Sequence, residues 1–357
     1  MRKCIPRLSI SICTFTPRLL SRFLYLGADI LSFMQGTVVG VLRGGPSREH
    51  EVSLKTGHAI VTNLPRDRYT VRDIYIDKEG VWHERGMPTD PSRALRTVDV
   101  VVIGLHGEYG EDGEVQKVLE TLGVPYTGSD SFGSYIAMHK VIAKEKAKEM
   151  GLLTPKYHLI EEGSDVESEL AKVVRTFHQP VVVKPVKWGS SVGVSIVAGY
   201  APLLAITNQL LEEGSGGVLI EELIKGTEAT AGVVEGLRGE ELYSLPTIEI
   251  VPPEKDFFSY EAKYSGATRE ICPGRFKKDV SEELMRQARL MHESLGLRHY
   301  SRSDFMISPK GIYYLETNTL PGMTEESLLP KSLAAVGVTF PQFLTHLVDL
   351  ALAQKKR

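Results

Sequence analysis

The feature that most constrains the fold is an alternation of apolar, strand-like runs with helical stretches, which begins at residue 37. In the first part of the chain this pattern predicts strands and helices in turn, at 37–42, 48–64, 69–76, 98–105 and 114–122. Such alternation is typical of βαβ units, in which helices connect the strands of a parallel sheet. We therefore expect an α/β protein that starts with a parallel-sheet domain.

The pattern changes near residues 135 and 224, which predicts three α/β units in series. We expect an N-terminal unit at 36–134, a central unit at 135–223 and a C-terminal unit at 224–357. A chain of 357 residues is long enough for two or three domains of ordinary size.

Residues 1–35 differ from the rest, because they hold five basic side chains and only one acidic side chain, Asp29. The apolar run at 23–28 is too short to span a bilayer. A strand is predicted directly after Met34, so Met34 is a candidate for the true start and 1–35 for a wrongly assigned extension. A cleaved targeting segment is the alternative.

Composition excludes several classes of protein. Charged residues make up 24% and apolar residues 42% of the chain, as in an ordinary globular protein, and the net charge of -3 provides no basic field for nucleic acid. The three cysteines form no CxxC pair, which favours a reducing, cytoplasmic compartment. We expect neither a nucleic-acid nor a membrane partner.

Common nucleotide and metal motifs are absent from the sequence. It contains no G-K-[ST] of a P-loop, no G-x-G-x-x-G dinucleotide fingerprint and no H-E-x-x-H zinc motif. P-loop enzymes, typical dinucleotide oxidoreductases and zincins are therefore excluded.

The most informative segment is a predicted hairpin at 300–318. If its turn centres on Lys310, Asp304 lies opposite Glu316 and Arg302 opposite Asn318, with all four on one face. Two carboxylates and an amide oxygen suit Mg²⁺, and a guanidinium suits a phosphoryl group or a developing oxyanion. A solvated polar sheet face is the alternative interpretation.

Two further segments suggest phosphate and nucleotide binding. A strand delivers Lys184, and the Gly/Ser loop at 186–193 leads into another strand, so its backbone N–H groups can cover phosphates. The strand at 219–223 runs into a turn that ends at Glu228, which can present groups to adenine and ribose. An ordinary turn and solvated surface acids are the alternatives.

A glycine turn follows the first strand and leads into a helix, for which Ser47 is the predicted N-cap. The positive helix N-terminus would then face the crevice where α/β folds bind ligands. Glu49 either offsets the helix dipole or holds a ligand ammonium group, and His106 follows a neighbouring strand.

The loop at 260–266 has the composition of a lid over a substrate, or of an ordinary surface loop.

Together, in this order, these segments resemble the D-alanine:D-alanine ligases, which have the three-domain ATP-grasp fold with a Rossmann-like N-terminal domain. The resemblance covers about residues 37–352. It is carried by five phrases in register, at 49–53, at 106–107 with 110–113, at 184–185 with 189–193, at 261–264, and at 316–318 with 321–324.

The resemblance implies an enzyme that joins two D-alanine molecules through an acylphosphate for peptidoglycan synthesis, releasing ADP and phosphate. It implies ATP contacts by eight residues: Lys140, Lys184, Ser191, Glu221, Glu222, Ile224, Glu228 and Lys263. Two Mg²⁺ ions, replaceable by Mn²⁺, would be held by Asp304, Glu316 and Asn318.

The resemblance also implies which residues meet D-alanine. Glu49 would bind the first ammonium group and join Ser190 and Tyr264 in a network that closes the lid, while Arg302 and the Gly322 N–H would stabilise the tetrahedral intermediate. The remaining implied substrate contacts are Val52, Ser53, His106, Ser327 and Leu328. A homodimer is a further expectation from the family.

Three residues depart from the family pattern: Arg43, Ser301 and Trp188. None is a proposed ligand, but Trp188 is bulky for its place in the phosphate loop. A related ATP-grasp ligase that uses D-lactate or another second substrate is one alternative, against which Tyr264 argues. A non-catalytic nucleotide-binding or scaffold protein is another, and against it argues the presence of four residues: Lys184, Arg302, Asp304 and Glu316.

Overall fold

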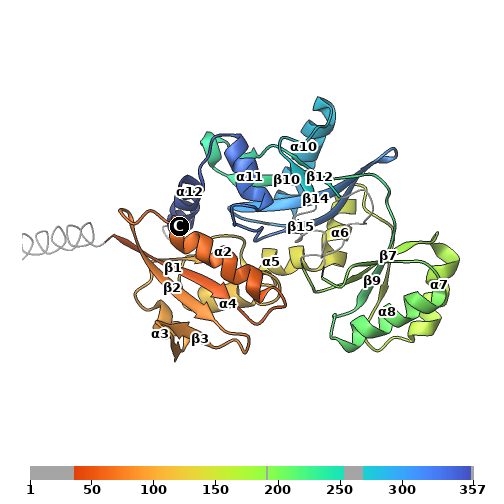
Figure 1. Cartoon of the computed structure of the whole chain (residues 1–357), viewed down its shortest axis with the longest axis horizontal. Helices are drawn as coiled ribbons and strands as arrows, with labels where there is room; N and C mark the ends of the chain where they lie inside the picture. The colour runs from red at the N-terminus through yellow and green to blue at the C-terminus, as the bar shows by residue number, and fades with distance from the viewer. Residues whose placement is uncertain (1–35, 190–191, 253–267, 355–357) are drawn as a thin grey trace, which may run out of the picture.

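The structure is a computed structural model that describes residues 36–189, 192–252 and 268–354. Three separate sheets, each with its own helices, follow one another along the chain (Figure 1). The predicted α/β class is confirmed.

The N-terminal sheet has the strand order β4-β3-β2-β1-β5. Its strands β1 (Thr37–Gly44), β2 (Tyr69–Ile76) and β5 (Val100–Ile103) are parallel, as the sequence predicts. The short strands β3 (Trp82–Glu84) and β4 (Met87–Thr89) extend the sheet in antiparallel fashion, which makes it mixed rather than wholly parallel. The helices of this unit are α2 (His50–Asn63), α3 (Pro91–Leu95) and α4 (Glu114–Thr121).

The central sheet has four antiparallel strands in the order β6-β9-β7-β8. The strands are β6 (Tyr157–Ile160), β7 (Val181–Pro185), β8 (Ser195–Val197) and β9 (Val218–Glu222). Leucine and valine side chains of α7 (Val166–Thr176) and α8 (Tyr200–Glu212) share a core with it. The predicted phosphate loop is the connection between β7 and β8.

The C-terminal sheet has six strands and is antiparallel throughout. Its strands are β10 (Thr227–Glu235), β11 (Leu242–Ser244), β12 (Ile248–Val251), β13 (Arg269–Ile271), β14 (Tyr300–Ser308) and β15 (Gly311–Asn318). The described residues of this unit also form a short 3-10 turn, Leu237–Gly239, and the helices α10 (Lys278–Ser294), α11 (Leu328–Ala335) and α12 (Phe340–Gln354).

The helices α5 (Ser131–Met138) and α6 (Lys140–Glu149) pack against β15 of the C-terminal sheet. Ala137, Ala143 and Ala147 lie in one buried cluster with Phe305 and Tyr314. The small alanine side chains let these helices approach the sheet closely. The domain boundary near residue 135 stays a prediction, but α6 shares its core with the C-terminal unit.

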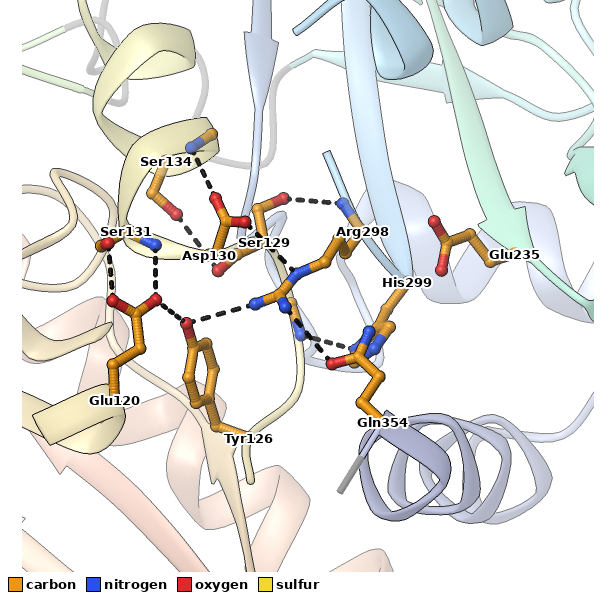
Figure 2. A network of polar contacts seen from close by, with 12 residues as sticks. Glu120, Tyr126, Ser129, Asp130, Ser131, Ser134, Glu235, Arg298, His299 and Gln354 are labelled. Atoms are coloured by element: carbon orange, nitrogen blue, oxygen red, sulfur yellow. Dashed lines mark hydrogen bonds and ion pairs between the residues drawn. The ribbon is translucent and has the colours of Figure 1, made fainter. Parts of the chain in front are cut away.

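The N-terminal and C-terminal units are joined by a polar network (Figure 2). Arg298 donates to the Tyr126 hydroxyl at 3.2 Å and lies 3.9 Å from Asp130. The Gly128 N–H donates to Nδ1 of the buried His299 at 3.0 Å. Below this network α12 packs against β5 and α2, so the end of the chain completes the N-terminal core.

No single helix in the described part of the chain is long and apolar enough to cross a membrane. The pair α11 and α12 passes that test of length and composition only when taken together, and the two helices are bent by 102°.

Candidate active site

A cavity of about 430 Å³ lies between the central and C-terminal sheets. Apolar side chains from both sheets, among them Val182, Ile196, Met306 and Leu315, form part of its wall. Eight of the residues singled out in the sequence also line it: Lys140, Lys184, Glu221, Glu222, Ile224, Glu228, Asp304 and Glu316. A wall with an apolar part and several charged groups is typical of a nucleotide pocket.

Glu221 on β9 organises two buried lysines. Its Oε2 lies 2.9 Å from Lys184 Nζ and its Oε1 lies 2.6 Å from Lys144 Nζ. Burial raises the pKa of Glu221, but the ammonium groups of Lys144 and Lys184 lower it by more, so that it falls to about 2. Burial likewise lowers the pKa of Lys184, yet Glu221 and Glu316 raise it above its ordinary value. Glu221 therefore keeps Lys184 charged in the cavity, a role that the sequence did not predict.

Lys140, at the first turn of α6, reaches the same cavity from another side. Its Nζ donates to the Trp188 carbonyl at 2.6 Å. Burial lowers the pKa of Lys140, and Glu316 raises it in part. Two lysines from different elements thus converge, as phosphate binding would require.

The hairpin formed by β14 and β15 places its polar residues as predicted. Asp304 pairs with Glu316, and Arg302 pairs with Asn318. Asp304 accepts two hydrogen bonds from Arg302, at 2.9 and 2.8 Å, and one from the Asn318 amide at 3.1 Å. The Thr230 hydroxyl donates a further bond at 2.7 Å. Burial lowers the pKa of Arg302, but Asp304 and Glu316 raise it above its usual value, so this guanidinium is charged.

Glu49 lies where the N-terminal unit meets the loop after β7. It is 3% exposed and stands in the turn that enters α2. A Cβ atom at Gly189 would lie 2.6 Å from Glu49 Oε1, and one at Gly107 would lie 3.1 Å from it. Both glycines therefore leave room for this carboxylate, which reaches the residue that precedes the predicted partner Ser190.

His106 lies in the same region and is buried. Its Nε2 lies 2.7 Å from the Thr56 hydroxyl, and its backbone N–H donates to Ser53 Oγ at 2.9 Å. Burial lowers the pKa of His106 to about 4, and the charge of Arg302 contributes to this. His106 is thus a neutral, oriented group at neutral pH rather than a cation.

Glu111 is a further member of this region to which the sequence analysis gave no role. Its Oε2 accepts the Gly107 N–H at 2.9 Å and its Oε1 accepts the Leu320 N–H at 3.3 Å. Burial and the charge of Glu49 raise the pKa of Glu111 to about 8. The residue belongs to the phrase at 110–113, but nothing in the sequence indicates that it would bridge two distant turns.

Gly322 and Ser327 are brought together at the start of α11. A Cβ atom at Gly322 would lie 2.7 Å from Ser327 Oγ, and that hydroxyl accepts the Thr324 N–H at 3.1 Å. Leu328 is the first residue of α11 and is partly buried. Val52 is half-buried on α2, beside the buried Ser53.

Comparison with known families decides the identity. A family model described as the D-ala D-ala ligase C-terminus matches residues 147–349, and one described as the D-ala D-ala ligase N-terminus matches 38–93 and 84–129. The chain belongs to the D-alanine:D-alanine ligase family. It is accordingly an ATP-dependent ligase with the ATP-grasp fold, of the kind that serves peptidoglycan synthesis, as the sequence predicts.

Individual relatives of this ligase agree. The D-alanine--D-alanine ligase of Syntrophobacter fumaroxidans is 39% identical over 327 residues, which cover 88% of this chain and 97% of the relative. The crystal structure of a D-alanine--D-alanine ligase from Bacillus anthracis in complex with ATP has a TM-score of 0.73 at 32% identity and covers 90% of this chain and 99% of its own. The D-Ala:D-Ser ligase VanG of Enterococcus faecalis has a TM-score of 0.76 at 27% identity, with coverages of 89% and 100%.

One prediction about this ligase is wrong, and four predicted site residues cannot be placed. Ser47 is not the N-cap of α2, because the helix begins at His50; its hydroxyl instead donates to the His106 carbonyl and accepts the Glu49 N–H. Four predicted site residues lie outside the described part of the structure: Ser190, Ser191, Lys263 and Tyr264.

Proposed function

We propose that the cavity between the central and C-terminal sheets binds ATP and that the region between Glu49 and Arg302 binds D-alanine. The observation that carries the proposal is that two lysines, Lys140 and Lys184, line the same cavity as five acidic side chains: Glu221, Glu222, Glu228, Asp304 and Glu316. The buried Glu49 carboxylate lies at the adjoining loop, beside Gly189, which itself lines the cavity.

ATP would lie with its adenine against the apolar part of the cavity wall, near Glu222 and the backbone of Ile224. Glu228 on β10 lines the cavity and is a candidate partner for the ribose hydroxyls. Lys140 and Lys184 would hold the phosphates, because Lys140 is buried, the Lys184 side chain is only 12% exposed, and both ammonium groups would gain charge-assisted bonds there. Glu221 would act mainly through Lys184 rather than on the base.

Asp304, Glu316 and Asn318 fit a divalent cation by their chemistry. Two carboxylates that pair across neighbouring strands, with an amide 3.1 Å from one of them, form a hard oxygen-donor set. Among the described residues, no group of three or more His, Cys, Asp or Glu side chains is arranged to hold a metal ion, so the proposed set includes the Asn318 amide. We propose two Mg²⁺ ions here, with Mn²⁺ as a substitute; they would neutralise phosphate charge.

The reaction then needs three groups around D-alanine: the Glu49 carboxylate, the Arg302 guanidinium and the backbone N–H of Gly322. Glu49 would hold the ammonium group of the first D-alanine while the carboxylate of that D-alanine attacks the γ-phosphorus of ATP, which forms the acylphosphate and releases ADP. The amine of the second D-alanine attacks the acylphosphate carbon, a proton is lost and phosphate leaves. Arg302 and the Gly322 N–H would stabilise the oxyanion, because Arg302 is a charged donor that two hydrogen bonds to Asp304 hold in place and a backbone N–H is a donor of fixed direction.

The second substrate would be placed by Ser327 and Leu328, while His106, Val52 and Ser53 would line the first site. For Ser190, Ser191, Lys263 and Tyr264 the implied roles remain predictions. We also propose that the enzyme acts in the cytoplasm, because ATP is its substrate, and that it forms a homodimer, which sedimentation at micromolar concentration would test.

The first experiment is ADP and phosphate release with Mg-ATP and D-alanine, with the product identified by mass. Parallel reactions contain L-alanine alone, D-alanine with D-lactate, or D-alanine with D-serine. We expect release only where D-alanine is present and a dipeptide as the main product. If D-alanyl-D-lactate or D-alanyl-D-serine formed in preference to D-alanyl-D-alanine, the second substrate would instead be D-lactate or D-serine.

A matched pair of variants tests the nucleotide site. Lys184→Met removes a buried ammonium group from the cavity and should raise the KM for ATP at least about tenfold. Lys172→Met removes an exposed lysine of the same unit, which pairs with Glu169, and should leave the KM unchanged. Equal KM values for the two variants would contradict the placement of ATP.

A further inference from the structure

Arg48 is an N-terminal-unit side chain that contacts the central unit at two points. Its guanidinium carbon lies 3.9 Å from the centre of the Trp188 ring. Its NH1 group lies 3.4 Å from Glu213 Oε2, and its NH2 group donates to the Glu213 carbonyl at 3.2 Å. Glu213 is itself fixed by the Gln209 amide at 2.9 Å. Arg48 therefore spans from the turn before α2 to the end of α8.

Trp188 is well placed to transmit this contact. Trp188 is 5% exposed as a residue and belongs to the core of the central unit. A Cβ atom at Gly193 would lie 3.1 Å from that ring, so the glycine makes room for it. Backbone hydrogen bonds hold the two residues before Trp188: the Val186 N–H donates to the Gly217 carbonyl, and the Lys187 N–H donates to the Ser215 carbonyl. The ring is thus a rigid surface on which the guanidinium stacks.

The backbone at Trp188 and Gly189 touches two groups of the proposed reaction. The Trp188 carbonyl accepts the bond from Lys140 Nζ at 2.6 Å. Gly189 lies directly against the Glu49 carboxylate, as the 2.6 Å distance from a Cβ atom there to Glu49 Oε1 shows. A shift of this short segment would therefore move an ammonium group and a carboxylate together.

We propose that Arg48 is a positioning residue that fixes the 186–189 segment against the N-terminal unit through the Trp188 ring. By this contact it holds Lys140 and Glu49 in the relative positions that ATP and D-alanine require. The proposal rests on the proposed roles of those two residues. A lysine would not replace Arg48, because only the planar guanidinium stacks on the ring and reaches Glu213 at the same time.

The test uses Arg48→Met, which keeps the apolar stem, and Arg48→Lys, which keeps the charge. Both should raise the KM for ATP and for D-alanine by about three- to tenfold, with a smaller change in kcat. Arg96→Met, an exposed arginine of the same unit, is the control and should change neither constant. The midpoint of thermal unfolding should stay close to that of the parent for all three variants.

A double-mutant cycle tests whether Arg48 acts through the Trp188 ring or independently of it. Arg48→Met should have almost no further effect on KM in a Trp188→Leu background, because the contact through which it acts is gone. Glu213→Gln should have a weaker effect than Arg48→Met, since it leaves the stacking intact. Additive effects of Arg48→Met and Trp188→Leu would overturn the proposal.

A spectroscopic readout needs no turnover. The chain has two tryptophans, Trp82 and Trp188, so Trp82→Phe leaves Trp188 as the single indole emitter. In that background Arg48→Met should shift the emission to longer wavelength, because the ring gains contact with water. Unchanged emission together with unchanged KM values would overturn the proposal. If Arg48→Met shows the emission shift but the separate variant Lys140→Met has a normal KM for ATP, the result would count against the proposed role of Lys140.

Discussion

The carboxylate of Glu221 lies 2.9 Å from the ammonium group of Lys184, inside the cavity that we assign to ATP. The same carboxylate holds Lys144, whose side chain is only 1% exposed. Glu221→Gln would leave these two buried ammonium groups without their counter-charge. We expect it to lower the free energy of unfolding by about 3–5 kcal/mol. Urea unfolding of the purified variant measures this.

Glu149→Gln is the control for that loss. It breaks an ion pair with Lys146 in which both side chains are largely exposed, at 62% and 36%. Pairs of this kind contribute about 0–1 kcal/mol, so its unfolding curve should almost coincide with that of the parent. If the unfolding curve of Glu221→Gln also coincided with that of the parent, Lys144 and Lys184 would have to be stabilised by groups other than Glu221.

Glu316 is the acid on β15 that pairs across the hairpin with Asp304. Glu316→Gln keeps the shape of the side chain but removes a charge from the proposed cation site. We expect phosphate release to fall at least about 100-fold while the unfolding curve is preserved. Glu325→Gln, an exposed acid before α11, should keep full activity. Near-normal activity of Glu316→Gln would remove this residue from the metal site.

Gly189 leaves space for the Glu49 carboxylate, since a Cβ atom there would lie 2.6 Å from Oε1. Gly189→Ala should therefore displace Glu49 and raise the KM for D-alanine by about tenfold, which steady-state kinetics would measure. Glu49→Asp shortens the acid and should restore part of the lost affinity when combined with Gly189→Ala. A double variant worse than either single variant would mean that the two residues do not share this contact.

Local patterning was sufficient to predict most elements. The parallel strands β1, β2 and β5 and the helices between them follow from hydrophobic periodicity. The antiparallel strands β3 and β4 were missed, because three-residue strands carry too little alternation to be recognised. The packing of α6 on β15 was not predicted either, since it depends on contacts between segments distant in the sequence.

The hairpin shows how a prediction can depend on a detail that the sequence hides. Its turn pairs Ser308 with Gly311, so it centres between Pro309 and Lys310 rather than on Lys310. That register alone would not bring Asp304 opposite Glu316. An irregularity between Asp304 and Phe305 shifts the pairing and restores the predicted partners. The polar face was thus predicted correctly, but the bulge that produces it was not.

The role of Glu111 could not be predicted for a different reason. Its position depends on the backbone of Leu320 and on the charge of Glu49, neither of which is close to it in the sequence. Burial of such a residue is a property of the assembled units. The same holds for Glu221, whose lysine partners come from α6 and β7.

His299 provides the last prediction, on acid stability. The ring is fully buried at the junction of the N-terminal and C-terminal units, and burial lowers its pKa to about 4 (Figure 2). In the unfolded chain the pKa is about 6.5. Between these values the unfolded state binds more protons, so the contribution of His299 to stability is complete above pH 6.5 and is lost as the pH falls toward 4.

His299→Asn removes this titration while keeping an acceptor for the Gly128 N–H. Asparagine also tolerates the left-handed backbone of this position, where φ is 63°. We expect the slope of unfolding free energy between pH 4 and 6.5 to decrease by up to about 1.4 kcal/mol per pH unit, as urea unfolding at several pH values would measure. Glu111 acts in the opposite direction, because its raised pKa favours the native state at lower pH. Glu111 is present in both the variant and the parent, so its contribution cancels when the two slopes are subtracted. An unchanged slope would show that His299 is protonated to the same extent in the folded and the unfolded state.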